Sequence, residues 1–404
     1  MQAQLNAPDP LLAQPGPTIM RAALAQRNYE ALTKAGAVHA PGLSEIYQAD
    51  MTALLQQAIT TDLPVRERLV WFWANHFTVS GRAGSWALGL LGCYLHDAIR
   101  PHVTGHFADM LKAVMRHPAM LAYLDNHLSV GPNSPDGLAH HQGLNENLAR
   151  ECLELHTLGA GAGYTQADVT AFAAILTGRS IDMGSDTPPG FVYKPRTHEP
   201  GRKSFMGYSV PEGLVGSEDV LAFIAGHPAT HRHLATQLVR HYIADAPPDR
   251  CVCRIETVLN ETHGDLRQAM LAVFELPEAW QPRTKFLAPA EYAVAVQRAL
   301  GLPVEPGFHL LATTDDLGQH FGDALLPNGW PDTEADWISG EAILKRADWA
   351  LFQARRPGAP TADAVLAATF GDDCSSATRA AVARCPDPAE ALATVLVSPE
   401  FLRR

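Results

Sequence analysis

Cysteine and long hydrophobic runs are both scarce in this sequence. Its 404 residues include six cysteines and no C-x-x-C pair, so neither a disulfide framework nor a zinc ribbon is indicated. We expect most of these thiols to be buried structural side chains. The longest apolar run, at 86–95, is well short of the roughly 18 residues of a membrane span. The sequence therefore predicts no membrane span.

Positive charge is also scarce. Lys and Arg number 31 against 43 Asp and Glu, which gives a formal net charge of -12 at pH 7. An excess of negative charge repels phosphate backbones, so we expect no nucleic-acid partner. The motifs G-x-x-x-x-G-K-[ST], G-x-S-x-G and H-E-x-x-H are all missing. Their absence removes the main support for a P-loop NTPase, an α/β-hydrolase or a zincin protease.

The residues that are present favour helices. Hydrophobic residues make up 47% of the chain and recur at helical spacing, as in Leu43, Tyr47, Met51, Leu54, Leu55 and Ile59. Prolines are tolerated in the first turn of a helix, and we expect helices to start at Pro64, Pro101 and Pro228. The sequence predicts a mainly α, multi-helical globular protein.

Residues 179–213 are the exception to this helical pattern. Glycines, prolines and scattered aromatic residues replace the helical periodicity there, which predicts a small β insertion. It would separate an N-terminal helical lobe at 1–178, which carries the candidate site, from a C-terminal helical lobe at 214–404. No flexible linker is visible, so one continuous domain is the alternative.

The most informative helix is expected at 145–159, between the natural N-cap Asn145 and the natural stop Gly159. At about 100° per residue, the polar residues share an arc of about 140°, and they are Glu146, Asn147, Arg150, Glu151, Glu154 and Thr157. His156 falls on the opposite, apolar side, where a core histidine is expected. The polar face is either solvated and joined by i,i+4 ion pairs, or buried with carboxylates that bind a metal or act as acid and base.

Histidines elsewhere give weaker candidates. His76 follows an aromatic run whose neighbours would bury it and lower its pKa, which suits a metal ligand or a base. The alternative is a core histidine bonded to backbone. His102 and His106 stand four residues apart, which would allow both to face a metal from one helix, but no third protein ligand is in view and a surface face is favoured.

Two tryptophans stand close together in a turn-rich stretch near the C-terminus. Trp330 and Trp337 flank a run of turn-forming residues. Exposed aromatic faces suit flat ligands, so the pair predicts either a cleft wall or a clamp that holds the loop on the core.

Six stretches between roughly residues 60 and 355 form a distinctive set: RERLVWFWANHFTVS, AIRPHVTGHFADMLKAVMRHPAMLAYLDN, GPNS, NENLARECLELHTLGAGAGYTQADVTAFAAILTG, THEPGRKSFMG and LPNGWPDTEADWISGEAILKR. Together they resemble a bacterial family known as domain of unknown function number 1800. The resemblance implies that the polar face of the 145–159 helix is functional. It also implies an aromatic preference at the position of His156, which supports a core role there.

The resemblance bears on the compartment and partners as well. No signal peptide is visible, which by itself favours the cytoplasm. Family members usually begin with a further segment, so this chain looks truncated and periplasmic export remains open. Related proteins are often encoded beside exported, sulfatase-like proteins, which implies such a protein as a partner. Localisation is therefore undetermined by the sequence.

We expect a site where the polar face meets His76 and the start of the following helix. Thr165 would cap that helix, and Asp168 would complete a capping-box-like turn. The expected catalytic groups are Glu151, Glu154 and Arg150, the binding groups Asn147, Glu146, Asn75, Thr165 and Asp168, and the metal ligands His76, Glu151 and Glu154.

Three functions are compatible with this site. One is an enzyme that hydrolyses an extracytoplasmic polymer or conjugate by acid–base or metal-assisted chemistry, with a divalent metal as the cofactor in the second case. Another is a non-catalytic binding or accessory protein in which the charged helix is a buried structural network. The third is a metal-dependent oxidoreductase, since His and carboxylate ligands also suit iron and copper.

Overall fold

A computed structural model describes residues 1–36, 42–184, 188–281, 285–303 and 310–404. Within these ranges the protein is mainly helical, with two small two-stranded sheets, which confirms the predicted fold class. No described helix has the length and apolar character needed to cross a membrane.

The helices before the strands are α1 (Gln2–Asn6), α2 (Ile19–Lys34), α3 (Leu43–Thr60), α4 (Pro64–His76), α5 (Ser85–Tyr94), α6 (Phe107–Arg116), α7 (Pro118–Tyr123), α8 (Pro135–His140), α9 (Asn147–Glu151) and α10 (Gln166–Leu176). Two π-helical segments, Leu95–Ile99 and Cys152–His156, directly extend α5 and α9.

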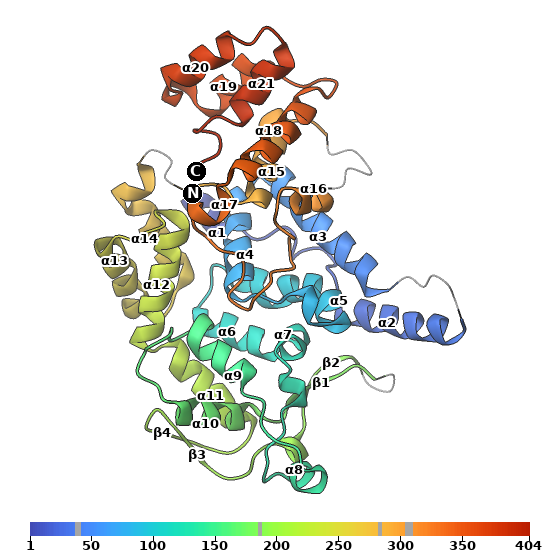
Figure 1. The fold of residues 1–404 in the computed structure, drawn as a ribbon. Helices are drawn as coiled ribbons and strands as arrows, with labels where there is room; N and C mark the ends of the chain where they lie inside the picture. The colour runs from blue at the N-terminus through green and yellow to red at the C-terminus, as the bar shows by residue number, and fades with distance from the viewer. Residues whose placement is uncertain (37–41, 185–187, 282–284, 304–309) are drawn as a thin grey trace.

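The helices after the strands are α11 (Leu214–Ala225), α12 (Pro228–Tyr242), α13 (Asp249–Glu261), α14 (Leu266–Glu275), α15 (Pro289–Leu300), α16 (Leu310–Asp316), α17 (Glu334–Trp337), α18 (Gly340–Ala354), α19 (Ala362–Thr369), α20 (Ser376–Ala383) and α21 (Pro388–Leu396). Helices α12, α13 and α14 pack side by side, while α19, α20 and α21 lie at the opposite end of the molecule from α8 (Figure 1).

The predicted β insertion is present as two antiparallel hairpins. Strand β1 (Arg179–Asp182) pairs with β2 (Gly190–Tyr193), and β3 (Lys203–Phe205) pairs with β4 (Tyr208–Val210). The first hairpin is tied to α11 by the buried guanidinium of Arg179, which donates to Ser217 Oγ at 2.9 Å and pairs with Glu218. The insertion is therefore anchored on the helices.

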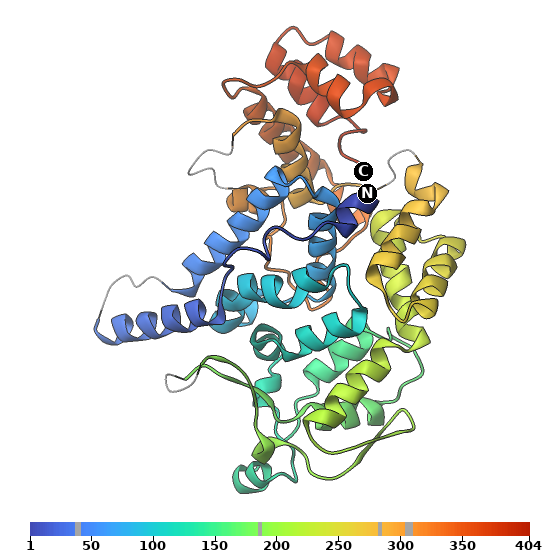
Figure 2. The ribbon, with the colours of Figure 1, turned by 180° about the vertical axis from the view of Figure 1, so that it is seen from behind.

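Among the described residues the hydrophobic core forms one large cluster, one smaller cluster and a group of three, Leu55, Ala290 and Leu310, from α3, α15 and α16. The large cluster joins side chains from both sides of the β insertion, from Leu5 to Val273, while the smaller one runs from Phe286 to Leu402. The proposed division into lobes at 178 and 214 stays a prediction. Both views show the two marked ends of the chain near one another (Figures 1 and 2).

Two of the three expected proline starts are confirmed. Pro64 and Pro228 open α4 and α12, whereas Pro101 lies in the short 3₁₀ turn Arg100–His102. Residues after this turn form backbone bonds with a distant segment, as in Phe107 N to Gly264 O at 2.9 Å, so the helix starts only at Phe107.

The expected pairing of His102 and His106 on one helix face is wrong for the same reason. His102 ends the 3₁₀ turn, and His106 is the N-cap residue of α6. The β-bridge between His106 and Asp265 holds the intervening backbone out of a helical conformation. Of the cysteines, four are buried as expected, but Cys253 is exposed and Cys385 half-buried.

A buried ion cluster attaches the N-terminal segment to the core. Arg100 forms two parallel bonds with Glu67, Nη1 to Oε1 at 2.6 Å and Nη2 to Oε2 at 2.9 Å, and also bonds Asp9 Oδ2 at 3.1 Å. All three side chains are at least 95% buried. Bidentate geometry of this kind offsets part of the desolvation cost of the charges.

Glu67→Ala is expected to lower the free energy of unfolding by roughly 3–5 kcal/mol, because it leaves the Arg100 charge buried with one partner fewer. Urea unfolding followed by circular dichroism measures this change. Glu341→Ala is the matched control, since Glu341 is 78% exposed in its pair with Lys345 and should change the free energy by about 0.5 kcal/mol or less. Equal losses of unfolding free energy in Glu67→Ala and Glu341→Ala would contradict the role of Glu67 in a buried ion cluster.

Candidate functional site

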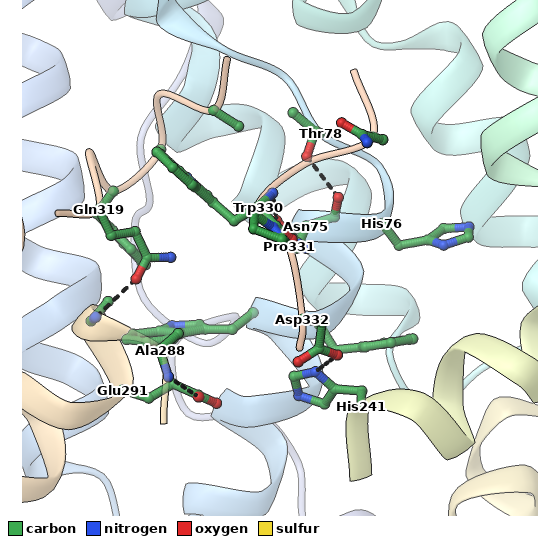
Figure 3. A pocket seen from close by; sticks show the side chains of 18 of the residues that line it. Asn75, His76, Thr78, His241, Ala288, Glu291, Gln319, Trp330, Pro331 and Asp332 are labelled. Carbon is green, nitrogen blue, oxygen red and sulfur yellow. Dashed lines mark hydrogen bonds and ion pairs between the residues drawn. The ribbon is translucent and has the colours of Figure 1, made fainter. Parts of the chain in front are cut away.

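A cavity of about 630 Å³ lies between α4, α12, the start of α15 and the segment 317–336. This volume is within the range that holds a small ligand. One part of its wall is apolar and the other carries ionisable groups, and the residues that the argument uses are Met51, Trp71, Leu91, Phe321, His76, His233, His241, Glu291, Trp330 and Asp332. Figure 3 shows the polar part of the wall.

The polar part is organised around a contact between His241 and Asp332. His241 Nδ1 lies 2.8 Å from Asp332 Oδ2, and Figure 3 shows the ring and the carboxylate facing one another. Arg404 Nη2 and Lys285 Nζ lie 3.6 and 3.7 Å from Asp332 Oδ1. Burial alone would raise the pKa of Asp332, but His241, Arg404 and Lys285 outweigh it and hold this pKa well below its usual range.

The His241 imidazole is held in a neutral state. Burial lowers its pKa and the charge of Arg404 adds to the effect, while Asp332 and Glu291 oppose it. The ring packs against Phe72, with centroids 5.1 Å apart. No described residue hydrogen-bonds Nε2 of this ring, and His241 is among the residues that line the cavity.

Glu291 links α15 to the same cluster. Its carboxylate accepts the Ala288 amide at 3.1 Å as part of the α15 capping box. It also forms an ion pair with Arg404, and Arg68 Nη2 lies 3.9 Å from the same oxygen. Arg404 and Arg68 therefore hold the pKa of Glu291 below its usual value although burial raises it.

Asn75 positions the loop that carries Asp332. Its side-chain Nδ2 donates to Trp330 O at 2.9 Å, and its Oδ1 accepts from Trp330 N at 2.7 Å. Gly329 allows this approach, because a Cβ at its φ of +75° would lie 2.5 Å from Asn75 O. The side chain of Asn75, an expected binding residue, thus holds the loop through two hydrogen bonds to the backbone of Trp330.

The two tryptophans of this loop take different positions. Trp330 lines the cavity, whereas Trp337 is buried and donates from Nε1 to Pro331 O at 3.0 Å. Their ring centroids are 5.8 Å apart. One therefore forms the cleft wall and the other clamps the loop.

His76 and His233 cap the end of the π-helical segment Cys152–His156. Their Nε2 atoms lie 3.0 Å from His156 O and 2.9 Å from Leu155 O. These carbonyls are at the helix end, where backbone acceptors lack an intrahelical partner. Burial lowers the pKa of both histidines, so neutral rings fill this role. π-helical segments often occur at functional sites.

The polar-face helix is shorter and less regular than expected. It begins at Asn147, whose amide donates to Asn145 Oδ1 at 2.9 Å. The π-helical segment follows a wider turn than an α-helix, so residues after Glu151 do not keep the faces predicted at 100° per residue. Thr157 is therefore buried, and its Oγ1 donates to Cys152 O at 2.7 Å. His156 is fully buried, as its apolar position predicted.

The charged residues of this face form ion pairs at the surface. Arg150 Nη2 lies 3.0 Å from Glu146 Oε2, and Arg150 Nη1 lies 3.7 Å from Glu154 Oε1, with about a third of each side chain exposed. Glu146 also accepts from Gln166 Nε2 at 2.9 Å. Burial and the charge of Glu154 raise the pKa of Glu151, while Arg150 opposes them.

The expected cap of the next helix is confirmed. Thr165 Oγ1 accepts the Asp168 amide at 3.2 Å, and Asp168 Oδ2 accepts the Thr165 amide at 2.8 Å. Asp168 Oδ1 also accepts the Met206 amide at 2.7 Å, which ties α10 to the β3–β4 hairpin. The side chains of Thr165 and Asp168 thus bond to backbone amides in this structure. Asn147, another expected binding residue, is exposed.

The proposed metal ligands do not form a recognisable metal group. Among the described residues, no three His, Cys, Asp or Glu side chains are placed to hold one ion. His76 contacts the His156 carbonyl, Glu154 pairs with Arg150 at the surface, and Glu151 is half-buried. The metal set of His76, Glu151 and Glu154 stays a prediction from sequence.

The comparison with protein families agrees with the residue patterns. The family described as "Protein of unknown function (DUF1800)" matches residues 1–403. This chain belongs to that family. No curated protein and no solved structure matches it.

The sequence of this DUF1800 member did not single out the cavity residues His241, Glu291 and Asp332. Asp332 stands in the LPNGWPD stretch that carries part of the family resemblance, which is the one signal that pointed toward it. His241 was one of 18 histidines and was indistinguishable by spacing, because its partner is 91 positions away.

Acid is expected to destabilise this DUF1800 protein through its buried histidines. Burial lowers the pKa of His117 and of His156 to about 3, against about 6.5 when unfolded. The stability that each neutral ring contributes is present above pH 6.5. It is lost as the pH falls, by about 1.4 kcal/mol per pH unit for each histidine, because only the unfolded state takes up the proton. Urea unfolding at pH 7 and pH 5 measures this slope.

His156→Phe should remove part of the slope and raise stability at pH 7. Neither ring nitrogen of His156 has a hydrogen-bond partner within the described ranges, and removing an unsatisfied buried polar group is favourable. His117→Phe is the contrasting variant, because His117 Nδ1 accepts the Ala119 amide at 3.1 Å and its loss should cost about 1 kcal/mol. Destabilisation by both changes at pH 7 would argue against this account of His156.

Proposed function

We propose that this protein is a hydrolase in which His241 acts as a general base on a ligand held in the cavity. The observation that carries the proposal is the His241 Nδ1 to Asp332 Oδ2 contact of 2.8 Å in the wall of the cavity of about 630 Å³. A cavity of this size suits a small molecule or the end of a larger conjugate.

The tautomer of His241 follows from its partners. A carboxylate accepts hydrogen bonds only, so Nδ1 carries the proton and Nε2 the lone pair. Arg404 Nη2 lies 3.4 Å from the same Nδ1, but the shorter contact to Asp332 decides the proton's position. Nε2 is then the basic atom, and Asp332 holds the ring in orientation.

The chemistry is that of water attack on an acyl carbon. His241 Nε2 takes a proton from water while the water oxygen bonds to the carbonyl carbon of an ester or amide. The imidazolium then returns that proton to the leaving oxygen or nitrogen as the bond to it breaks. Asp332 stabilises the transient imidazolium, the role a carboxylate plays beside a catalytic histidine.

The polar-face helix supplies a competing site for the same reaction. There Glu151 and Glu154 would be the acid and base, with Arg150 as an anion clamp. The raised pKa of Glu151, caused first by burial, supports this assignment. A binding function without catalysis is a further alternative, and ligand binding without turnover would favour it.

His241→Gln is expected to lower kcat/KM at least about 100-fold toward neutral 4-nitrophenyl esters, since a general base typically contributes that much. Asp332→Asn should lower it as well by leaving the imidazole misoriented. The exposed Asp249→Asn is the control, because its carboxylate is 89% exposed and outside the cavity. Unchanged turnover in His241→Gln together with loss in Glu151→Gln would move the site to the polar-face helix.

The pH profile gives a second readout. Only the neutral imidazole can accept a proton, so kcat/KM should be level near pH 7 and fall as the pH drops through the lowered pKa of His241. The fall should therefore be centred below pH 6.5. A fall centred at or above pH 6.5 would count against His241.

A further inference from the structure

One permanently charged cation lies in the wall of the cavity. Arg240 is the only lysine or arginine among the described residues that line it, and the wall residues from α12 are His233, Gln237, Arg240 and His241. Residues at this spacing share one face of a helix. Arg240 Nη1 donates to Gln237 Oε1 at 3.3 Å, so its guanidinium lies over the α12 face that lines the cavity. Burial lowers the pKa of His233, and the charge of Arg240 adds to this effect, which agrees with that placement.

The Arg240 guanidinium has no counter-charge in the part of the chain that the structure describes. Gln237 is its one hydrogen-bond partner there, and no Asp or Glu forms an ion pair with it. The side chain is half-buried, yet Nε and Nη2 are not among the buried polar atoms that lack a partner. Both atoms are therefore accessible to a ligand. This edge of a guanidinium can bind a carboxylate through two parallel hydrogen bonds.

The acidic residues of the wall do not supply the missing charge. Asp245, Glu291 and Asp332 each pair with a lysine or arginine side chain that is outside the lining. Asp336 is exposed and accepts from Thr333 Oγ1. A half-buried charge without a counter-charge is unfavourable, and an anionic ligand would remove that cost at Arg240.

The charges of the wall favour an anion with a single negative charge. One guanidinium balances one carboxylate. A phosphate monoester carries about two negative charges at pH 7, and the second charge would lie in a cavity whose other ionic groups include the carboxylates of Glu291 and Asp332. The wall offers no second lysine or arginine for it among the described residues.

The remaining wall is apolar and partly aromatic. Trp71 and Phe321 contact each other with ring centroids 4.8 Å apart, and Met51 and Leu91 lie beside Gly322, whose Cβ would approach both within 3.0 Å. The absence of a side chain at Gly322 leaves room there for the apolar body of a ligand. Burial of such a body would supply most of the binding free energy.

We infer that the cavity takes an ester or amide that carries a free carboxylate, which pairs with Nε and Nη2 of Arg240 while an apolar body lies against Trp71 and Phe321. The inference rests on the proposed function in taking this cavity as the substrate site, and it adds the substrate class. Arg240 and His241 are consecutive in α12. The substrate carboxylate would therefore lie near the acyl carbon that water attacks.

Four probes that share a 3-phenylpropyl group test this class by their affinity alone. They are 4-phenylbutanoate, its isosteric amide 4-phenylbutanamide, 3-phenylpropyl phosphate and 3-phenylpropylammonium, titrated calorimetrically at pH 7.5. The carboxylate should bind at least about tenfold more tightly than the amide, a difference of about 1.4 kcal/mol. Equal or tighter binding of the amide or the ammonium probe, or no binding of any probe, would overturn the inference. Tighter binding of the phosphate would overturn the assignment to a carboxylate.

Substitutions link the binding to the guanidinium. Arg240→Gln should lower the affinity for 4-phenylbutanoate about tenfold and abolish its preference over the amide, with little change in melting temperature because no ion pair is lost. Arg240→Lys keeps the charge without the planar pair of donors, so its affinity should fall between the two. Arg232→Gln is the matched control, since Arg232 is also in α12 but pairs with Asp249 and Glu256 outside the lining. Equal losses in Arg232→Gln and Arg240→Gln, or an unchanged affinity in Arg240→Gln, would contradict the role of Arg240.

The same titration on His241→Gln separates this inference from the proposed hydrolysis. If both hold, the variant loses turnover and still prefers the carboxylate to the amide. That preference in a wild type that shows no ester turnover would overturn the hydrolase and support the ligand class. Ester turnover by a wild type that binds the carboxylate and the amide equally would do the reverse.

Discussion

The ion pairs around Asp332 bring together parts of the chain that are far apart in sequence. His241 is at the end of α12, Arg404 is in the last described segment, and Lys285 precedes α15. A carboxylate in such a position is favourable only while the cations of Arg404 and Lys285 and the N–H of His241 are present, because it has lost hydration. The loop with Asp332, the end of α12 and the start of α15 must therefore assemble as a unit, and the cavity is the space between them.

On the other side of the cavity, buried backbone groups without charge also need partners, in this case hydrogen-bond donors. The π-helical segment Cys152–His156 ends with carbonyls that no helical N–H can reach, and two imidazoles from α4 and α12 satisfy them. These bonds fix the ring tautomers. Both rings also line the cavity, and the other π-helical segment contributes a further wall residue, Leu95.

Local sequence patterns predicted local structure well. The capping box of Thr165 and Asp168, the core position of His156 and the hairpins after Arg179 all depend on residues within a few positions of one another. The predictions were wrong where a distant segment intervenes. The helix expected at Pro101 starts later because the backbone near His106 pairs with the turn at Asp265.

The candidate site also combines features that local sequence predicts with contacts that only distant segments can make. By itself the sequence determined the helical class, the family and the i,i+4 pairs of Glu146, Arg150 and Glu154, because helical periodicity places such residues together whatever surrounds them. Only the tertiary structure decided that His241 meets Asp332 and that Asn75 holds the loop at Trp330. Those contacts depend on how whole helices pack, and the pairing of buried polar groups that selects them has no counterpart in the spacing of residues along the chain.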